Sequence, residues 1–223
     1  MFFCTIVNRD PREVATKLLG LVLKHNLNGR WLESRIIETE AYLLEEKGSH
    51  AFLGETPSRR ALFMEVGTIY IYYTHGGDTF NFSCQGPRNA VLIKAGIPNP
   101  PELVDSKMLQ VMHQRNPING RKREPRKLCS SQTLFCKALG LKVLDWSQKR
   151  LISGTLELSD PEDPPQLIIQ TTRLRIPKGK NEHLPLRYLN AGYTGSSTQN
   201  PIRSKKNNEI KIINPQRRFS QNL

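Results

Sequence analysis

Residues 21–42 read LVLKHNLNGRWLESRIIETEAY, and this stretch decides the fold class. Two β-prone runs, 21–25 and 30–42, flank Asn26-Leu27-Asn28-Gly29, and an Asn-Gly pair between such runs is a strong β-hairpin signal. The second run is mainly apolar and ends in the polar string Glu38-Thr39-Glu40-Ala41-Tyr42. The hairpin therefore places Glu40 at the end of a strand.

Further β-prone runs follow at 68–74, 79–84 and 90–95, and their spacing is typical of an antiparallel meander. Two more strands are predicted at 155–158 and 166–175. A helix is predicted from Pro11 to Leu19, capped by Asp10, and apolar residues at intervals of three and four predict helices at 101–114 and 130–139. Because the helices cluster rather than alternate with strands, we expect one α+β domain, a mainly antiparallel β-meander with surrounding helices.

The chain of 223 residues carries 33 Lys and Arg against 20 Asp and Glu, a formal charge of +13. Such a charge is typical of proteins that neutralise phosphates, and membrane surfaces and acidic proteins are alternative partners. No apolar run approaches the ~20 residues of a spanning helix, and residues 1–10 lack the pattern of a secretory leader. We expect no membrane association and a cytoplasmic or nucleoid location in a bacterium, or a nuclear one in a eukaryote.

The chain is expected to divide into a domain, 1–193, and a basic polar tail, 194–223, that is loosely ordered. Its four cysteines form no C-x-x-C pair and have no matching histidines nearby, so neither a zinc site nor a disulfide framework is supported. No glycine-rich phosphate loop occurs. We expect no metal and no cofactor. A Cys–His nucleophilic pair stays open as an alternative, although nothing local marks a cysteine as activated.

Two polar clusters could carry chemistry. On a strand Glu38, Glu40 and Tyr42 share one face. The pattern alone favours a solvated strand edge whose carboxylates balance nearby arginines. The second cluster, YIYYTHG at 70–76, places Tyr70 and Tyr72 on one face. Aromatic strands usually belong to a core, but a strongly basic chain also suits an aromatic wall on which a base stacks, and composition leaves both interpretations open.

Two segments, KLLGLVL at 17–23 and RIIETEAYL at 35–43, resemble the opening of alkyladenine (3-methyladenine) DNA glycosylases, and the string ETEAY is highly specific. The resemblance spans roughly residues 10 to 190 and continues through His50, 56–63, 67–72, Asn81, 90–95, 127–129, 138–140 and 185–188. It implies an enzyme that flips an alkylated or deaminated purine out of duplex DNA and hydrolyses the N-glycosidic bond. The sequence does not choose among 3-methyladenine, 7-methylguanine, hypoxanthine and etheno-adenine.

The resemblance also implies residue roles. Glu40 would be the base that activates water, assisted by Lys94, because a carboxylate can both orient water and stabilise an oxocarbenium-like sugar. Stacking between electron-rich rings would select a positively charged alkylated purine. His75 would be the wedge that fills the gap left in the duplex. The residues implied to bind the base are Tyr42, His50, Tyr72, Asn81 and Leu174.

Three positions depart from the pattern of this family. Lys94 stands in place of an arginine, which keeps the charge but loses the fork geometry. His75 stands in place of the wedge tyrosine. Arg175 stands in place of a glycine that would allow close backbone approach. These changes motivate an alternative, a catalytically impaired protein of the same fold that binds lesions in DNA without turnover.

Candidate phosphate contacts, which would make the affinity for DNA salt-dependent, are Arg59, Arg60, Lys122, Arg123 and Lys127. Ordinary solvated surface explains any single one of them almost as well. The expected partner is duplex DNA containing damaged purines, bound by a monomer. A further alternative is an RNA-binding protein that uses the same aromatic face, which single-stranded RNA outcompeting duplex DNA would favour.

Overall fold

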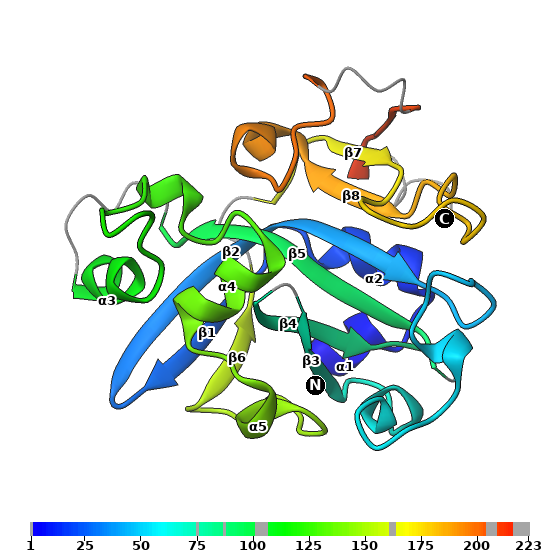
Figure 1. Cartoon of the computed structure of the whole chain (residues 1–223), viewed down its shortest axis with the longest axis horizontal. Helices are drawn as coiled ribbons and strands as arrows, with labels where there is room; N and C mark the ends of the chain where they lie inside the picture. Colours follow the sequence, from blue (N-terminus) through cyan, green and yellow to red (C-terminus); the bar gives the residue numbers. More distant parts are fainter. Residues whose placement is uncertain are drawn as a thin grey trace.

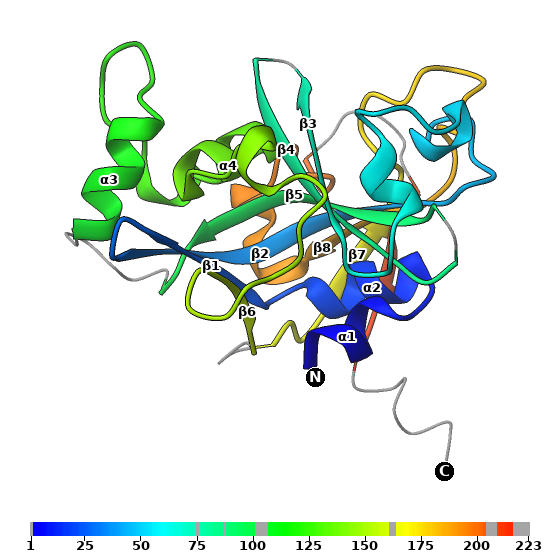
Figure 2. The ribbon, with the colours of Figure 1, turned by 90° about the horizontal axis from the view of Figure 1, so that it is seen from below.

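A computed structural model describes residues 2–74, 76–86, 88–100, 107–160, 164–203 and 209–215. Its frame is one antiparallel sheet with helices on both faces (Figures 1 and 2). The prediction of an α+β domain with a mainly antiparallel sheet is confirmed. In sheet order the strands are β3 (Ile69–Thr74), β4 (Gly77–Ser83), β5 (Ala90–Pro98), β2 (Arg30–Tyr42), β8 (Arg187–Asn190), β7 (Ile168–Thr171) and β9 (Lys211–Ile213).

The predicted hairpin forms between β1 (Val22–Leu27) and β2, and Leu27 pairs with Arg30 across the turn. Asn28 and Gly29 both have positive φ, 53° and 78°, as a type I′ turn requires. The outer edge of β1 pairs with β6 (Leu156–Ser159). The predicted meander also forms, as β3, β4 and β5, and β5 then pairs with β2. The sheet thereby places two strands, β4 and β5, between the aromatic strand β3 and the carboxylate strand β2.

Helices cover both faces of the sheet (Figure 2). On one face lie α1 (Phe2–Val7) and α2 (Pro11–Leu18), and α2 begins as predicted, with the Asp10 side chain accepting from the Arg12 N–H. The other face carries α3 (Lys107–Arg115), α4 (Gln132–Leu139) and, beside β3, α5 (Val143–Trp146). Ser131 caps the start of α4, and Gly140 ends it with a φ of 70°. Within the described residues, no helix has the length and apolar character to cross a bilayer.

Some predicted boundaries were wrong. The predicted strand 166–175 is confined to Ile168–Thr171, because its partner β8 provides only four residues and the ladder ends at Thr171 opposite Arg187. Of the predicted helix 101–114, the first six residues lie outside the described ranges. A short 3₁₀ turn, η3 (Pro125–Lys127), follows the basic loop 116–124, in a stretch for which no helix or strand was predicted.

Two parts of the segment predicted to be a loosely ordered tail, 194–200 and 211–213, make specific contacts. Residues 191–196 form a 3₁₀ segment, η4 (Ala191–Ser196), and Ser197 is buried. Farther along, β9 adds to the free edge of β7. The polar composition suggested disorder, but these residues are held by backbone hydrogen bonds, which do not depend on apolar side chains.

Candidate active site

The strand registers align a row of polar and aromatic residues across the sheet. Tyr70 on β3 lies opposite Asn81 on β4, which lies opposite Leu92 on β5, which lies opposite Glu40 on β2. Residues directly opposite each other in an antiparallel sheet point to the same face. The same face carries Tyr72, Lys94 and Tyr42, each two residues farther along its strand.

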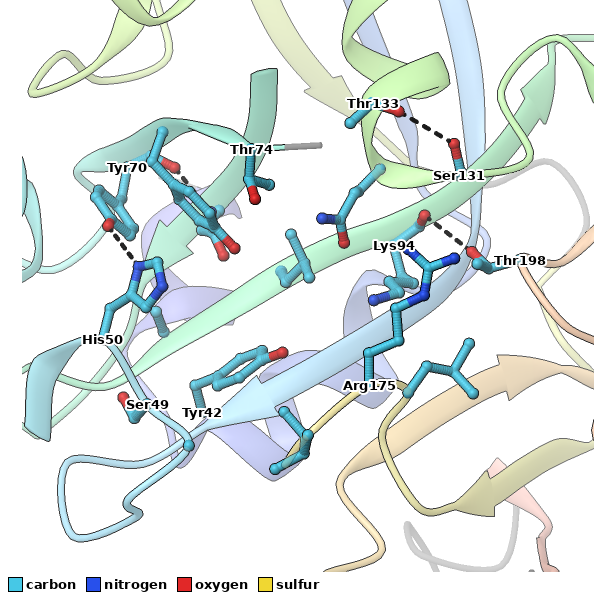
Figure 3. A pocket seen from close by; sticks show the side chains of 18 of the residues that line it. Tyr42, Ser49, His50, Tyr70, Thr74, Lys94, Ser131, Thr133, Arg175 and Thr198 are labelled. Atoms are coloured by element: carbon cyan, nitrogen blue, oxygen red, sulfur yellow. Dashed lines mark hydrogen bonds between the residues drawn. The ribbon is translucent and has the colours of Figure 1, made fainter. Parts of the chain in front are cut away.

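A pocket of about 460 Å³ opens above this row (Figure 3). The sheet forms its floor, the segment after β2 one side, and the start of α4 and the chain after β7 the others. Such a volume lies in the usual range for a small-molecule site. The lining includes five residues implied to bind the base, Tyr42, His50, Tyr72, Asn81 and Leu174, together with Lys94 and Arg175.

Glu40 is fully buried beneath the pocket, and its carboxylate is held from three directions. The Tyr42 hydroxyl donates to Oε2 at 2.8 Å, and Lys94 Nζ donates to the same oxygen at 3.2 Å. The Leu174 N–H donates to Oε1 at 3.2 Å. Groups from β2, β5 and the chain after β7 therefore orient one carboxylate.

The charges around Glu40 keep it ionised. Burial raises the pKa of Glu40, but Lys94, Arg187 and the hydrogen bonds from Tyr42 and Leu174 oppose it, and the pKa lies below its usual value. Burial and the Glu40 charge raise the pKa of Tyr42 well above its usual value, so the phenol stays protonated and donates. The predicted pair of Glu40 and Lys94 is brought into direct contact as an ion pair.

His50, Tyr70 and Tyr72 form one wall of the pocket. The Tyr70 and Tyr72 rings stack with centroids 5.2 Å apart, and the His50 ring lies 4.5 Å from Tyr72. His50 Nδ1 and the Tyr70 hydroxyl are 2.8 Å apart. Burial and the Arg59 charge lower the pKa of His50, which leaves its ring neutral at pH 7. Tyr42 lies across the pocket from Tyr70 (Figure 3).

A buried arginine supports the back of Tyr42. The Arg173 guanidinium carbon lies 4.6 Å from the centroid of the Tyr42 ring. The same guanidinium donates to the Glu46 carboxylate and to the Ala41 carbonyl. Burial raises the pKa of Glu46 against the opposing charge of Arg173. The cation therefore covers one face of Tyr42 and leaves the other for the pocket.

Sequence reasoning missed the contribution of the predicted tail. Thr198 lines the pocket, and its hydroxyl donates to the Lys94 carbonyl at 3.4 Å. Its N–H donates to Glu38 Oε2 at 2.7 Å, and Arg187 Nε donates to Glu38 Oε1 at 2.6 Å. No local pattern marks Thr198. Tyr70 was also missing from the predicted set, although its alternation with Tyr72 was a usable signal.

The predicted phosphate contacts are dispersed. Arg59 donates within the chain, to the Thr56 hydroxyl and, at 3.5 Å, to the His50 carbonyl. Arg123 donates to two backbone carbonyls of the basic loop, and Lys127 donates to the Gly195 carbonyl. Arg60 and Lys122 are exposed. The predicted wedge, His75, lies outside the described residues.

The cysteines take no part in this site. Cys84, Cys129 and Cys136 are buried. Burial raises the pKa of the Cys129 thiol to about 12, and it also raises the pKa of the other two. A nucleophilic thiolate forms where the pKa is lowered, so the Cys–His alternative has no support from these three thiols.

Comparison with known proteins identifies the family. The family model described as methylpurine-DNA glycosylase matches residues 5–194. A protein of Pseudomonas aeruginosa strain PAO1 is 50% identical over 200 residues, 89% of this chain and 84% of its own length. A Pseudomonas syringae protein is 51% identical over 196 residues, 87% and 88% of the two chains, and one from Methanoculleus marisnigri is 32% identical over 191 residues, 82% and 92%. All three carry the provisional name 3-methyladenine DNA glycosylase.

The chain belongs to the methylpurine-DNA glycosylase family. It is therefore a DNA glycosylase, an enzyme of DNA repair. The matched range contains every residue implied to act in the pocket, from Glu40 to Leu174, and ends before Thr198. The described pocket lining of this methylpurine-DNA glycosylase thus combines residues of the matched range with Thr198, which lies beyond it.

Proposed function

We propose that this methylpurine-DNA glycosylase hydrolyses the N-glycosidic bond of damaged purines that are flipped out of duplex DNA, with Glu40 as general base. One observation carries the proposal, a fully buried carboxylate kept ionised at the floor of an aromatic pocket of about 460 Å³. Burying a charge is costly unless the charge is paired. Ionisable groups in such environments cluster at functional sites. The provisional names of the relatives point to 3-methyladenine as one substrate.

In the proposed reaction the electrons of the N-glycosidic bond leave with the base, and the sugar becomes oxocarbenium-like. Glu40 takes a proton from water, whose oxygen bonds to the sugar carbon. Lys94 donates to Glu40 itself at 3.2 Å, so its part is to keep the carboxylate anionic and oriented. That contact differs from the expected direct assistance to the water.

The flipped base would stack between Tyr42 on one side and His50 with Tyr72 on the other. Stacking accepts any purine, because every base presents a π face. Asn81 Nδ2 donates to the Tyr70 carbonyl at 3.0 Å, which fixes the amide and leaves its oxygen as an acceptor toward the pocket. A damaged base is also cheaper to extract from the duplex than an intact one.

One side of the molecule suits the DNA backbone. The ends of β3 and β4, the loop between α3 and η3, and the η1 (Ala51–Leu53) and η2 (Arg60–Phe63) turns all project on the side of the sheet that carries α4 (Figure 2). The exposed cations Arg60 and Lys122 come from two of these segments. We propose that a monomer grips the duplex with this side and that His75, at the β3–β4 turn, is the wedge.

The test is base release under single-turnover conditions from duplexes carrying 3-methyladenine, 7-methylguanine, hypoxanthine or etheno-adenine. Glu40→Gln should bind lesion duplex like the wild type but release the base at least a hundredfold more slowly, the usual scale of general base catalysis. Glu33→Gln is the matched control, because Glu33 lies on the same strand but pairs with Lys24 rather than with the pocket residues Tyr42 and Lys94, and it should keep the wild-type rate. Tight binding without release by the wild type would support the binding-only alternative and overturn the proposal.

A further inference from the structure

Arg175 carries a charge that the pocket does not balance. Lys94, the other cation of the lining, is paired with Glu40. Arg175 is exposed, and within the ranges that the structure describes it makes no hydrogen bond or ion pair. Its side chain extends toward Lys94 and Thr198 (Figure 3). The pocket with ionised Glu40 therefore has a net positive charge at its mouth.

The backbone holds Arg175 firmly at this place. Its neighbours Leu174 and Ile176 both line the pocket, and the Leu174 N–H is bonded to Glu40. Arg175 itself has a φ of 60°, in the left-handed region that glycine adopts without strain and arginine rarely visits. The backbone that carries the Arg175 side chain is thus placed at the mouth by its two neighbours.

The rest of the lining offers a cationic base little compensation. The back of the Tyr42 ring, away from the pocket, is already in contact with the Arg173 cation. This cation–π interaction weakens the attraction of the same ring for a charged base on its other face. His50 is neutral at pH 7, because burial and the Arg59 charge lower its pKa. Glu40, the buried anion beneath the pocket, is already paired with Lys94 and lies in the field of Arg187.

We propose that Arg175 is a specificity-determining residue that biases the pocket toward neutral damaged purines and against purines with a fixed positive charge. The proposal rests on base excision in this pocket as argued above. Hypoxanthine and etheno-adenine represent the favoured class. The methylated purines 7-methylguanine and 3-methyladenine, both cationic in DNA, represent the class that is still excised but disfavoured. The charge–charge repulsion acts on the base as it enters, before its positive charge is released by cleavage of the N-glycosidic bond.

The experiment compares single-turnover release of hypoxanthine and of 7-methylguanine from otherwise identical duplexes. Arg175→Asn removes the charge and retains a residue that tolerates positive φ. Arg175→Lys keeps the charge, and Arg30→Gln, at the distant tip of the β1–β2 hairpin, is the matched control for loss of one surface charge. Exposed charges are partly screened, so Arg175→Asn should raise the ratio of 7-methylguanine to hypoxanthine release by about fivefold to tenfold. The lysine and the Arg30 variants should keep the wild-type ratio.

The outcomes separate this proposal from the one it rests on. Release of both bases by the wild type with an unchanged ratio in Arg175→Asn would overturn the role of Arg175 alone. An equal fall in both rates would show that Arg175 binds a phosphate of the flipped nucleotide instead, since a phosphate contact does not depend on the charge of the base. Release of neither base by the wild type would overturn both. A ratio that falls when salt is lowered for the wild type, but not for Arg175→Asn, would support the electrostatic cause.

Discussion

Replacing Arg187 by methionine tests whether the buried ion pair beneath the pocket holds the fold together. Arg187 and Glu38 are both fully buried, and Nε and Oε1 are 2.6 Å apart. The substitution leaves the Glu38 carboxylate in the interior with the Thr198 N–H as its one bonded donor among the described residues. Removing one partner of a buried pair costs about 3–5 kcal/mol, a large part of the ~5–15 kcal/mol by which domains are stable.

The assay is urea unfolding followed by tryptophan fluorescence, since the chain has two tryptophans. Arg187→Met should lower the free energy of unfolding by about 4 kcal/mol. A double variant, Glu38→Leu with Arg187→Met, should lose less stability, because no unpaired charge remains in the interior. Its remaining cost is about 1–3 kcal/mol for the Thr198 N–H, which is left without its acceptor. The control Arg12→Met breaks an exposed pair with Asp10 and should cost less than about 1 kcal/mol.

Two results would refute this reasoning. One is a loss below about 1 kcal/mol in Arg187→Met, which would mean that Glu38 is solvated or protonated when it loses its partner. The other is additivity, in which the double variant loses the sum of the losses measured for Arg187→Met alone and for Glu38→Leu alone. Residues that form a charge pair should instead be coupled.

Three further predictions concern the pocket, the sheet and the DNA face. Lys94→Gln should raise the pKa of Glu40, so the acid limb of the pH–rate profile, where protonation of the base ends release, should move to higher pH, whereas Lys94→Arg should leave it near the wild-type position. Gly96→Ala should destabilise the fold by about 1–3 kcal/mol in thermal unfolding, because a Cβ there would overlap Ser34 Oγ and crowd the Arg35 carbonyl. Gly195→Ala, which has open space around it, should be neutral, and equal effects of the two substitutions would contradict the packing. Lys122→Gln should reduce the slope of log affinity for duplex DNA against log salt by about one unit, and an unchanged slope would remove this residue from the interface.

Local signals predicted most of the strands and helices correctly. The Asn28-Gly29 turn, the cap at Asp10 and the stop at Gly140 each act within a few residues, and the structure has each of them. The residue at which β7 ends was not predictable in this way. A strand stops where its partner stops, and the length of β8 is unrelated to the residues of β7.

The family resemblance supplied the candidate residues but not their contacts. Lys94 was expected to assist the activation of water, and the structure pairs it with Glu40. Arg173 fell within the predicted strand 166–175 with no role assigned to it, and it covers the back of Tyr42. Each contact depends on the length and direction of a side chain in three dimensions, which a residue type alone does not determine.

The sequence by itself determined the hairpin, the alternation of faces along each strand, and thus that Glu40 and Tyr42 lie on one side at a strand end. Only the tertiary structure decided what those side chains meet. Lys94 is 54 residues away from Glu40, Leu174 is 134 away, and Thr198 is 160 away from Glu38. Such contacts follow from the order and register of strands in the sheet, because pairing joins segments whose separation along the chain leaves no mark on the local pattern of either.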